Sequence, residues 1–212
     1  MSFFKRVGLP PTYQLLLTSI FPRGKWKVLD LGCGSGIAGE LLNATHEHEF
    51  TGVDIFEPYL KKCKQKGFYD KTIKADLTKI KLQPKSYDVI LLLQVLEHLD
   101  KKDSSLLLKK VSKAAKKAVI VTVPNGDCVQ EEYDQNSFHI HKSTWAAGDL
   151  SKLGFKVYGQ AFKPIFGSKS YGAGEKAMLW QKIAVPLSTL IFPIIYFFPE
   201  IGAQLVAVKY TK

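Results

Sequence analysis

The segment that most constrains the fold of this chain is VLDLGCGSG, residues 28–36. An apolar run containing Asp30 is followed by glycines at positions 32, 34 and 36 and then by a sequence that favours a helix. Glycine permits a positive φ and lets a ligand come within contact distance of the main chain. A strand, a glycine-rich turn and a helix in this order predict an adenosine-containing ligand at the tip of the strand. We expect Asp30 to face the same crevice, where its charge would repel a pyrophosphate and favour a cation.

Strand and helix signals alternate along most of the chain. Apolar runs bounded by glycine, proline or acidic residues predict strands, whereas apolar residues at helical spacing predict the helices between them. Repeated alternation predicts an α/β fold with a doubly wound, mostly parallel sheet and helices on both faces. The predicted strands are 27–31, 50–54, 72–75, 87–93, 118–123, 155–159 and 204–210, and the predicted helices are 13–21, 37–42, 57–66, 103–117 and 142–153.

Composition limits the classes of partner. The chain has 212 residues, of which 46% are hydrophobic, and this is enough for one core and a single domain. Its net charge is +11, but Arg6 and Arg23 are its only arginines. Because arginine supplies the bidentate contacts that read phosphate and guanine, specific nucleic-acid binding is not expected. The three cysteines lack metal or disulfide spacing and the N-terminus lacks a secretory signal pattern, which indicates a cytoplasmic protein.

Acidic residues follow the second and third predicted strands. Asp54 lies about 20 residues after the glycines, the spacing at which a carboxylate reaches ribose hydroxyls in dinucleotide-binding folds. The alternative is that Asp54 caps the following helix or is a solvated loop residue. Asp76 follows the third strand, and its alternative role is that of an ordinary turn aspartate.

The fourth strand and the residues after it, YDVILLLQVLEHLD, form the next motif. This strand is expected beside the first one, at the point where the strand order reverses and ligands of open α/β sheets bind. Gln94, Glu97 and His98 are therefore expected to face the reacting groups. Together with VLDLGCGSG and Asp54, this motif resembles class I S-adenosylmethionine (SAM) methyltransferases, and the resemblance covers roughly residues 25–160 and the last strand.

The resemblance implies SAM as the cofactor and a Rossmann-like, seven-stranded sheet whose last strand is antiparallel. It also implies that Ile55 packs against the adenine, that Asp76 meets the adenine amino group and that Leu77 adds a backbone contact. The cofactor-binding residues implied in this way are Asp30, Gly32, Cys33, Gly34, Gly36, Asp54, Ile55, Asp76, Leu77 and Gln94.

The LEHL sequence is similar to that of enzymes that methylate quinone precursors and other small acceptors. Some related enzymes hold a divalent metal with an E-x-x-E-H cluster, but this chain has Gln94 in place of the first glutamate, so no metal is predicted. Glu97 and His98 are candidate catalytic residues. The alternative for His98 is a structural role as a capping or half-buried histidine.

The segment SFHIHKSTW, residues 137–145, contributes two further histidines. His139 and His141 are two residues apart, so on an extended segment they point the same way. They follow the fifth predicted strand, on the side expected for the acceptor. Either is a candidate general base, because a hydroxyl acceptor must lose its proton and histidine titrates near neutral pH. The alternative is that they cap and pack against Trp145 and Tyr133.

Residues 161–203 are the part least like the family, because they form a long hydrophobic insertion before the last strand. Residues 183–199 carry no charge, but three prolines interrupt them. We expect either a helical lid over the acceptor pocket or an interfacial segment that makes a peripheral membrane contact, and a membrane span is the third alternative. The predicted organisation is one domain with a cap helix in 1–24, a cofactor-binding core in 25–160, the insertion in 161–203 and the last strand in 204–212.

The sequence therefore predicts an enzyme that transfers a methyl group from SAM to an oxygen atom of a small-molecule, glycan or lipid-like acceptor. An RNA or protein methyltransferase is the enzymatic alternative, favoured by the net charge of +11 and opposed by the scarcity of arginine. A SAM-binding regulatory module without turnover is the alternative of a different class.

Overall fold

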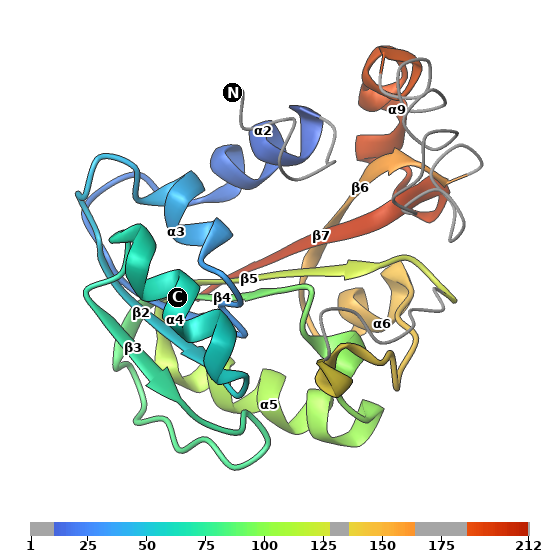
Figure 1. Cartoon of the computed structure of the whole chain (residues 1–212). Helices are drawn as coiled ribbons and strands as arrows, with labels where there is room; N and C mark the ends of the chain where they lie inside the picture. Colours follow the sequence, from blue (N-terminus) through green and yellow to red (C-terminus); the bar gives the residue numbers. More distant parts are fainter. Residues whose placement is uncertain (1–10, 128–135, 164–185, 212) are drawn as a thin grey trace. The chain divides into compact units, whose positions relative to one another are not determined.

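The computed structural model describes residues 11–127, 136–163 and 186–211. Within them, seven strands form one sheet in the order β3-β2-β1-β4-β5-β7-β6 (Figure 1). The pairs β1–β2, β1–β4, β2–β3 and β4–β5 are parallel. The predicted Rossmann-like, doubly wound α/β fold is confirmed. The strands are β1 (Lys27–Leu31), β2 (Glu49–Asp54), β3 (Lys71–Lys74), β4 (Tyr87–Leu93), β5 (Ala115–Pro124), β6 (Lys156–Phe162) and β7 (Gly202–Tyr210).

The last strand, β7, runs antiparallel to β5, as predicted. The backbone N–H of Asn125 donates to the carbonyl oxygen of Ala203 at 3.0 Å. At the other end of the same pair of strands, the N–H of Thr211 donates to the carbonyl oxygen of Lys117 at 2.9 Å. The residue number rises along one strand as it falls along the other, which is the antiparallel pattern.

The described residues divide into two compact units. The glycine-loop unit consists of 21–123, 136–143 and 208–211, and the insertion unit consists of 11–20, 124–127, 144–163 and 186–207. The helices of the glycine-loop unit are α3 (Ile37–Leu42), α4 (Glu57–Lys66), the 3-10 turn η1 (Leu96–His98), α5 (Lys101–Ala114) and the 3-10 turn η2 (Ser137–His139). Those of the insertion unit are α2 (Pro11–Ile20), α6 (Ala147–Lys152), α9 (Phe192–Phe197) and the 3-10 turn η3 (Pro199–Ile201).

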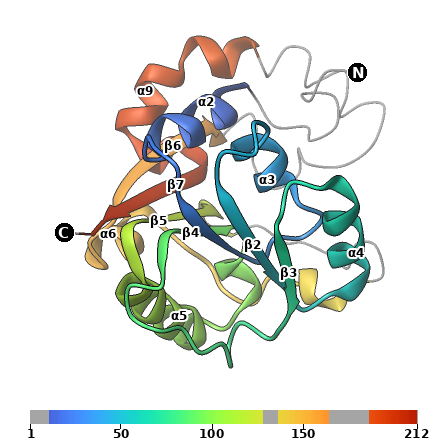
Figure 2. The ribbon, with the colours of Figure 1, turned by 90° about the vertical axis from the view of Figure 1, so that its left-hand side faces the viewer.

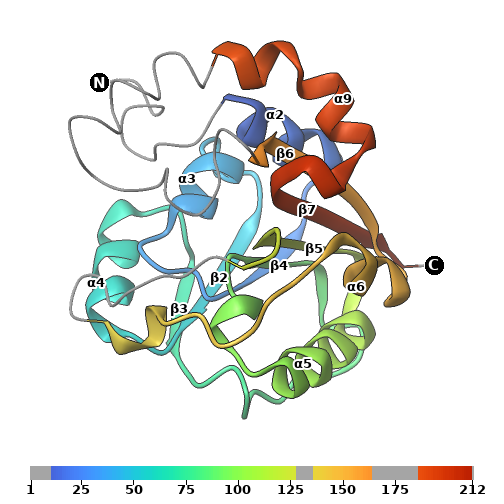
Figure 3. The same cartoon turned by 90° about the vertical axis from the view of Figure 1, so that its right-hand side faces the viewer.

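The core of the glycine-loop unit lies on both faces of its central strands. Residues 28–31 of β1 and 89–92 of β4 are fully buried, as expected for near-continuous apolar runs in a parallel sheet. The helices α3 and α4 lie on one side of these strands and α5 lies on the other (Figures 2 and 3). α4 packs on β2 and β3. The carboxyl ends of β1, β2 and β4 therefore meet at one edge of this unit, where ligands of such sheets bind.

In the insertion unit, α9 packs directly on β6. A side chain at Gly159 would place its Cβ 2.4 Å from the carbonyl oxygen of Ile195, so only glycine permits this close approach. The amide of Asn125 donates to the carbonyl oxygens of Pro199, Glu200 and Gly202 at 3.1, 3.0 and 2.7 Å and so fixes the end of the insertion. The predicted helical character of the insertion is seen in α9 and η3, while its residues 164–185 lie outside the described residues.

The boundary between α5 and β5 lies three residues earlier than predicted. The sequence AKKA at 115–118 has helical propensity, but Ala115 is already extended, with φ −78° and ψ 140°. Ala115 pairs with Tyr87, and Lys116 Nζ lies 3.3 Å from Asp88 Oδ1. Pairing with β4 therefore overrides the weak preference of alanine and lysine for a helix.

The helix predicted over 142–153 is α6, which begins five residues later, at Ala147. The backbone N–H groups of Lys142 and Ser143 donate to the carbonyl oxygen of Glu97 at 2.7 and 3.1 Å. These donors are bound outside any helix, so residues 142–146 are not helical. The helix begins instead where the carboxylate of Asp149 accepts a hydrogen bond from the N–H of Ala146 at 3.0 Å.

Among the described residues, no helix has the length and hydropathy needed to cross a bilayer. Residues 183–185 of the apolar segment 183–199, together with Tyr133 and Cys128, lie outside the described residues.

Candidate active site

The turn between β1 and α3 is built on three glycines with a positive φ, of 75° at Gly32, 52° at Gly34 and 84° at Gly36. A side chain at Gly32 would place its Cβ 2.5 Å from Cγ2 of Val95, so the turn lies tightly against the segment that follows β4. A Cβ at Gly34 would meet only Cδ2 of Tyr59, at 4.0 Å. The main chain is thus closely packed at Gly32 and open at Gly34, where a ligand can approach it.

Asp54, at the end of β2, braces this turn. Its Oδ2 accepts a hydrogen bond from the N–H of Gly34 at 2.8 Å, and its Oδ1 accepts one from the N–H of Phe56 at 2.8 Å. Each carboxylate oxygen keeps a further lone pair for a hydroxyl group. The structure brings Asp54 to the glycines as predicted, and its contact with a ribose stays a prediction.

Asp30 requires a correction, because it does not face an open crevice. Its side chain is 1% exposed, and Oδ2 accepts a hydrogen bond of 2.6 Å from the hydroxyl of Tyr69. The same hydroxyl accepts a hydrogen bond from the N–H of Gly39 at 3.0 Å. Burial raises the pKa of Asp30 to about 7. The raised pKa weakens the negative charge expected at this position, and the predicted part of Asp30 in cofactor binding stays a prediction.

The other residues predicted to bind the cofactor lie near the same strand ends. Cys33 is buried, and a hydrogen bond with Cys63 together with burial raises the pKa of its thiol, so its side chain belongs to the interior. Ile55 is half-buried after β2, and Leu77 is buried after β3. Asp76 lies between Ala75 and Leu77 and is half-buried. Their contacts with a cofactor stay predictions.

Asp76 has partners within its own turn. Its Oδ1 accepts hydrogen bonds from the backbone N–H and the hydroxyl of Thr78 at 2.9 and 2.7 Å, and its Oδ2 lies 3.5 Å from Nζ of Lys79. The hydroxyl of Thr78 is the main cause that lowers the pKa of Asp76. Asp76 therefore acts as a turn aspartate, which was its alternative role. Any contact with the adenine has to use the remaining lone pairs of its carboxylate.

Gln94 connects the end of β4 to Glu97. It has a φ of 57°, unusual for a residue other than glycine, and its N–H donates to the carbonyl oxygen of Thr122 at 2.9 Å. In the amide orientation that gives both its nitrogen and its oxygen a hydrogen-bond partner, Gln94 donates to Oε1 of Glu97 at 3.3 Å and accepts from the N–H of Val123 at 3.3 Å. Gln94 therefore positions Glu97, and its predicted cofactor contact is untested.

Glu97 and His98 stand in a desolvated environment within η1. Glu97 is 2% exposed, and burial raises its pKa to about 8. Burial, followed by the neighbouring His141, lowers the pKa of His98 to about 4. At neutral pH, Glu97 is largely protonated and His98 is neutral.

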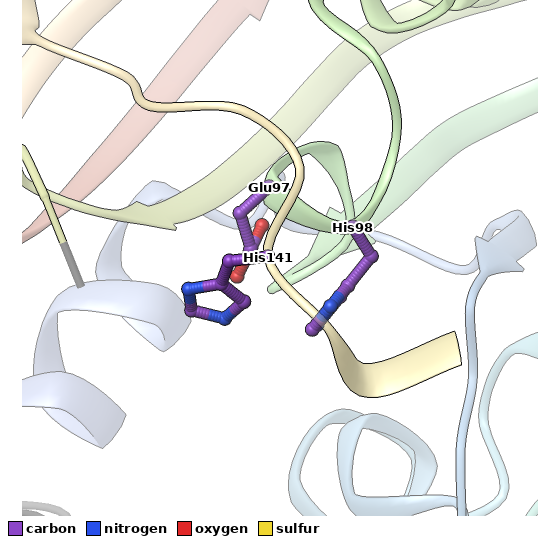
Figure 4. A group of neighbouring side chains, drawn as sticks. All are labelled: Glu97, His98 and His141. Carbon is purple, nitrogen blue, oxygen red and sulfur yellow. The ribbon is translucent and has the colours of Figure 1, made fainter. Parts of the chain in front are cut away.

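The structure gathers the histidines predicted from two distant segments. The ring of His98 lies 4.9 Å from that of His141 and 5.7 Å from that of His139, between ring centroids. Figure 4 shows the side chains of Glu97, His98 and His141 converging from η1 and from the segment after η2. The structure thus brings these side chains together after the ends of β4 and β5, whereas their catalytic roles stay predictions.

Comparison with known proteins adds the family. Residues 29–130 match the methyltransferase domain family, and this range includes the glycine turn, Asp54 and the segment after β4. This part of the chain belongs to the methyltransferase domain family. His139 and His141 lie beyond the matched range.

Two curated relatives and one solved structure are similar to the chain. An uncharacterized protein of Methanocaldococcus jannaschii is 27% identical over 144 residues, which are 68% of this chain and 61% of that protein. A ubiquinone biosynthesis O-methyltransferase of Idiomarina loihiensis is 36% identical over 95 residues, which are 42% of this chain and 38% of that enzyme. A SAM-dependent methyltransferase from Archaeoglobus fulgidus has the same fold, with a TM-score of 0.63, 19% identity and coverage of 94% of this chain and 93% of that one. The chain thus spans less than two thirds of the length of these curated relatives.

Two tyrosines near the site were not found from the sequence. Tyr69 contacts Asp30, and a Cβ at Gly39 or Gly52 would collide with its ring, at 2.3 and 2.9 Å. The ring of Tyr59 lies 5.4 Å from that of His139. Glycines at 39 and 52, in a helix and a strand where glycine is unfavourable, were the signal that a large side chain packs there.

Proposed function

We propose that this protein transfers the methyl group of SAM to an oxygen atom of a small-molecule, glycan or lipid-like acceptor. The observation that carries the proposal is a single contact: the glycine turn that would hold the donor packs against Val95, two residues before Glu97. A donor held by this turn and an acceptor beside the histidines would therefore lie next to each other. The similarity to a ubiquinone biosynthesis O-methyltransferase supports a small acceptor and oxygen as the methylated atom.

The residues present fit SAM. Space over Gly34 lets the cofactor approach the main chain, and Asp54 beside it offers lone pairs to ribose hydroxyls. Ile55 and Leu77 are apolar residues after β2 and β3, in the positions that the family uses around the adenine. The bound cofactor supplies an activated methyl group, so the protein itself has to bind, orient and deprotonate the acceptor.

The chain's own contribution to the reaction is positioning and proton removal. Holding the acceptor in a near-attack geometry can supply about 7–11 kcal/mol of the barrier. Proton removal by a nearby base adds about 100-fold to 10,000-fold. We assign the base to His139 or His141, both half-buried, with the Glu97 and His98 pair as the alternative.

The test combines binding and turnover. The purified protein is titrated with SAM in a calorimeter and then incubated with pools of hydroxylated metabolites, glycans and lipid precursors while release of S-adenosylhomocysteine is followed. We expect SAM binding and acceptor-dependent release. Binding without release from any pool would favour a regulatory module, and release with RNA or protein alone would contradict the proposed acceptor class.

We further propose that the protein is cytoplasmic and touches membranes through the apolar residues before and within α9. Ile194 and Phe197 are 56% and 74% exposed, and their spacing within α9 places them on one helical face; Leu190, which precedes α9, is 78% exposed. The opposite face packs through the buried Ile195. An exposed apolar helical face is the feature that binds the interface of a bilayer.

Flotation with vesicles of mixed neutral and anionic lipids tests this contact. We expect the wild type to float with the vesicles and a variant with Leu190→Ser and Phe197→Ser to remain in the aqueous fraction. A variant with Leu15→Ser, which changes another exposed leucine at 63% exposure, is the control. Equal flotation of all three proteins, or of none, would contradict the membrane contact.

A further inference from the structure

We propose that Glu97, His98 and His141 bind one divalent transition-metal ion, with zinc as the best match. Each residue offers one ligand atom, and these atoms all lie within 4.8 Å of one another (Figure 4). Ligand atoms on one tetrahedral zinc are about 3.4 Å apart, given zinc–nitrogen and zinc–oxygen distances of about 2.1 Å. Small rotations of the three side chains would bring their ligand atoms from within 4.8 Å of one another to this spacing. Two imidazoles and one carboxylate form a known zinc-binding donor set that leaves a coordination position open.

Unpartnered atoms within the cluster provide a second, independent observation. Oε2 of Glu97 and Nδ1 of His98 are both buried and have no hydrogen-bond partner in the described part of the chain. Most buried polar atoms in proteins are hydrogen-bonded, so each exception requires an explanation such as an ion. Nor does any described lysine or arginine form an ion pair with the Glu97 carboxylate. A cation between these two atoms satisfies both of them.

Backbone contacts hold the two segments together without help from the ligand side chains. The N–H groups of Lys142 and Ser143 donate to the carbonyl oxygen of Glu97, and the hydroxyl of Ser143 donates to the carbonyl oxygen of Leu96 at 3.0 Å. His141 is therefore tied to η1 by its two following residues. Such preorganisation lowers the entropy cost of collecting three donors around an ion.

Neighbouring groups also orient the donors. The amide of Gln94 donates to Oε1 of Glu97, which leaves Oε2 directed to the cluster. Nδ1 of His98 has no hydrogen-bond partner in the described part of the chain, so this nitrogen is available to an ion.

His141 is a metal ligand that the sequence analysis did not consider, because it compared only residues 94–98 with the E-x-x-E-H cluster. Gln94 supports the carboxylate in place of supplying a ligand, and the third ligand comes from a segment more than 40 residues later. The prediction of no metal rested on Gln94 alone. If the proposed function holds, His141 as a ligand would leave His139 as the base. The open coordination position would then receive an oxygen atom of the acceptor, which narrows the acceptor to hydroxyl, phenol or carboxyl compounds.

The experiment measures metal binding without SAM or acceptor. Tag-free protein is stripped with a chelator, dialysed and titrated with Zn²⁺ by calorimetry and with Co²⁺ by visible absorption, which reports the ligand geometry. We expect one Zn²⁺ per chain and a Co²⁺ spectrum of low coordination number. The variants Glu97→Gln and His141→Gln should each weaken Zn²⁺ binding at least 100-fold.

Matched variants decide where the ion binds. His139→Gln changes a neighbouring histidine outside the ligand set, and His46→Gln changes one elsewhere in the unit, so both should keep the wild-type affinity for Zn²⁺. His141→Gln alters a half-buried side chain, and its melting temperature shows whether it is folded. Absence of Zn²⁺ binding by the wild type, or unchanged binding by Glu97→Gln and His141→Gln, would overturn the proposal. Neither result depends on methyl transfer, which is measured separately.

Discussion

The glycine turn and the histidine cluster lie in the same unit but reach their geometry in different ways. Gly32 and Gly34 follow β1, and Asp54 ends β2. The N–H of Gly32 donates to the carbonyl oxygen of Val53, and the N–H of Gly34 donates to the carboxylate of Asp54. Glu97 and His98 meet His139 and His141 only because a segment after β5 binds to η1. A site encoded by neighbouring strands is tied to the stability of the sheet. A cluster assembled from distant segments can change its chemistry while the sheet remains intact.

The largest expected effect is on turnover, at the cluster. Alanine at His139 or His141 should lower single-turnover methylation by about 100-fold or more, because a base acts in the transition state alone. Calorimetric affinity for SAM should stay within a factor of about two, as the donor-binding residues are unchanged. If each variant keeps full activity, or melts early, catalysis rests on positioning and the contrast between the two regions fails.

The second effect is on stability, at the glycine turn. Gly32→Ala should lower the free energy of unfolding by about 3 kcal/mol, because its Cβ would meet Val95 and its φ is positive. Gly67→Ala is the control, since Gly67 also has a positive φ but has no atom within 4 Å of its added Cβ. That control should lose only about 1 kcal/mol in urea denaturation. Equal losses would show that contact with Val95 does not matter.

The third effect is on cofactor affinity. Asp54→Ala should weaken SAM binding by about 1.5–3 kcal/mol, the usual value for a hydrogen bond to a charged group. Asp54→Asn keeps an acceptor for the N–H of Gly34 but removes the charge, so it separates support of the turn from contact with the ribose. Unchanged calorimetric affinity in both variants would show that Asp54 only braces the turn.

The last effect is a pH dependence at Asp30, which is spread over about three pH units. Its pKa is raised by burial from 3.8 to about 7, so its contribution to stability is complete below about pH 4 and is lost as the pH rises through 7. Between pH 5 and 8, the wild type should therefore lose about 2.5 kcal/mol of unfolding free energy relative to Asp30→Asn. Urea denaturation of both proteins at several pH values measures the difference. Parallel pH profiles would contradict the raised pKa.

Much of the glycine-loop unit followed from local sequence. The bounds of β1, α3, α4 and β4 agree with the prediction, because their apolar periodicity and their end signals coincide. The prediction failed at 115–117 and at 142–146, where the local preference is weak. There, hydrogen bonds to β4 and to Glu97 decided the conformation.

The sequence by itself determined the glycine turn and its contact with Asp54, because three glycines and an acid after the next strand are enough to specify that backbone geometry. It also determined which histidines to consider. Only the tertiary structure decided that Asp30 is enclosed by Tyr69 and that His141 joins Glu97 and His98. Desolvation and the convergence of side chains depend on contacts between segments that are far apart in the chain. The local periodicity of the sequence does not predict those contacts.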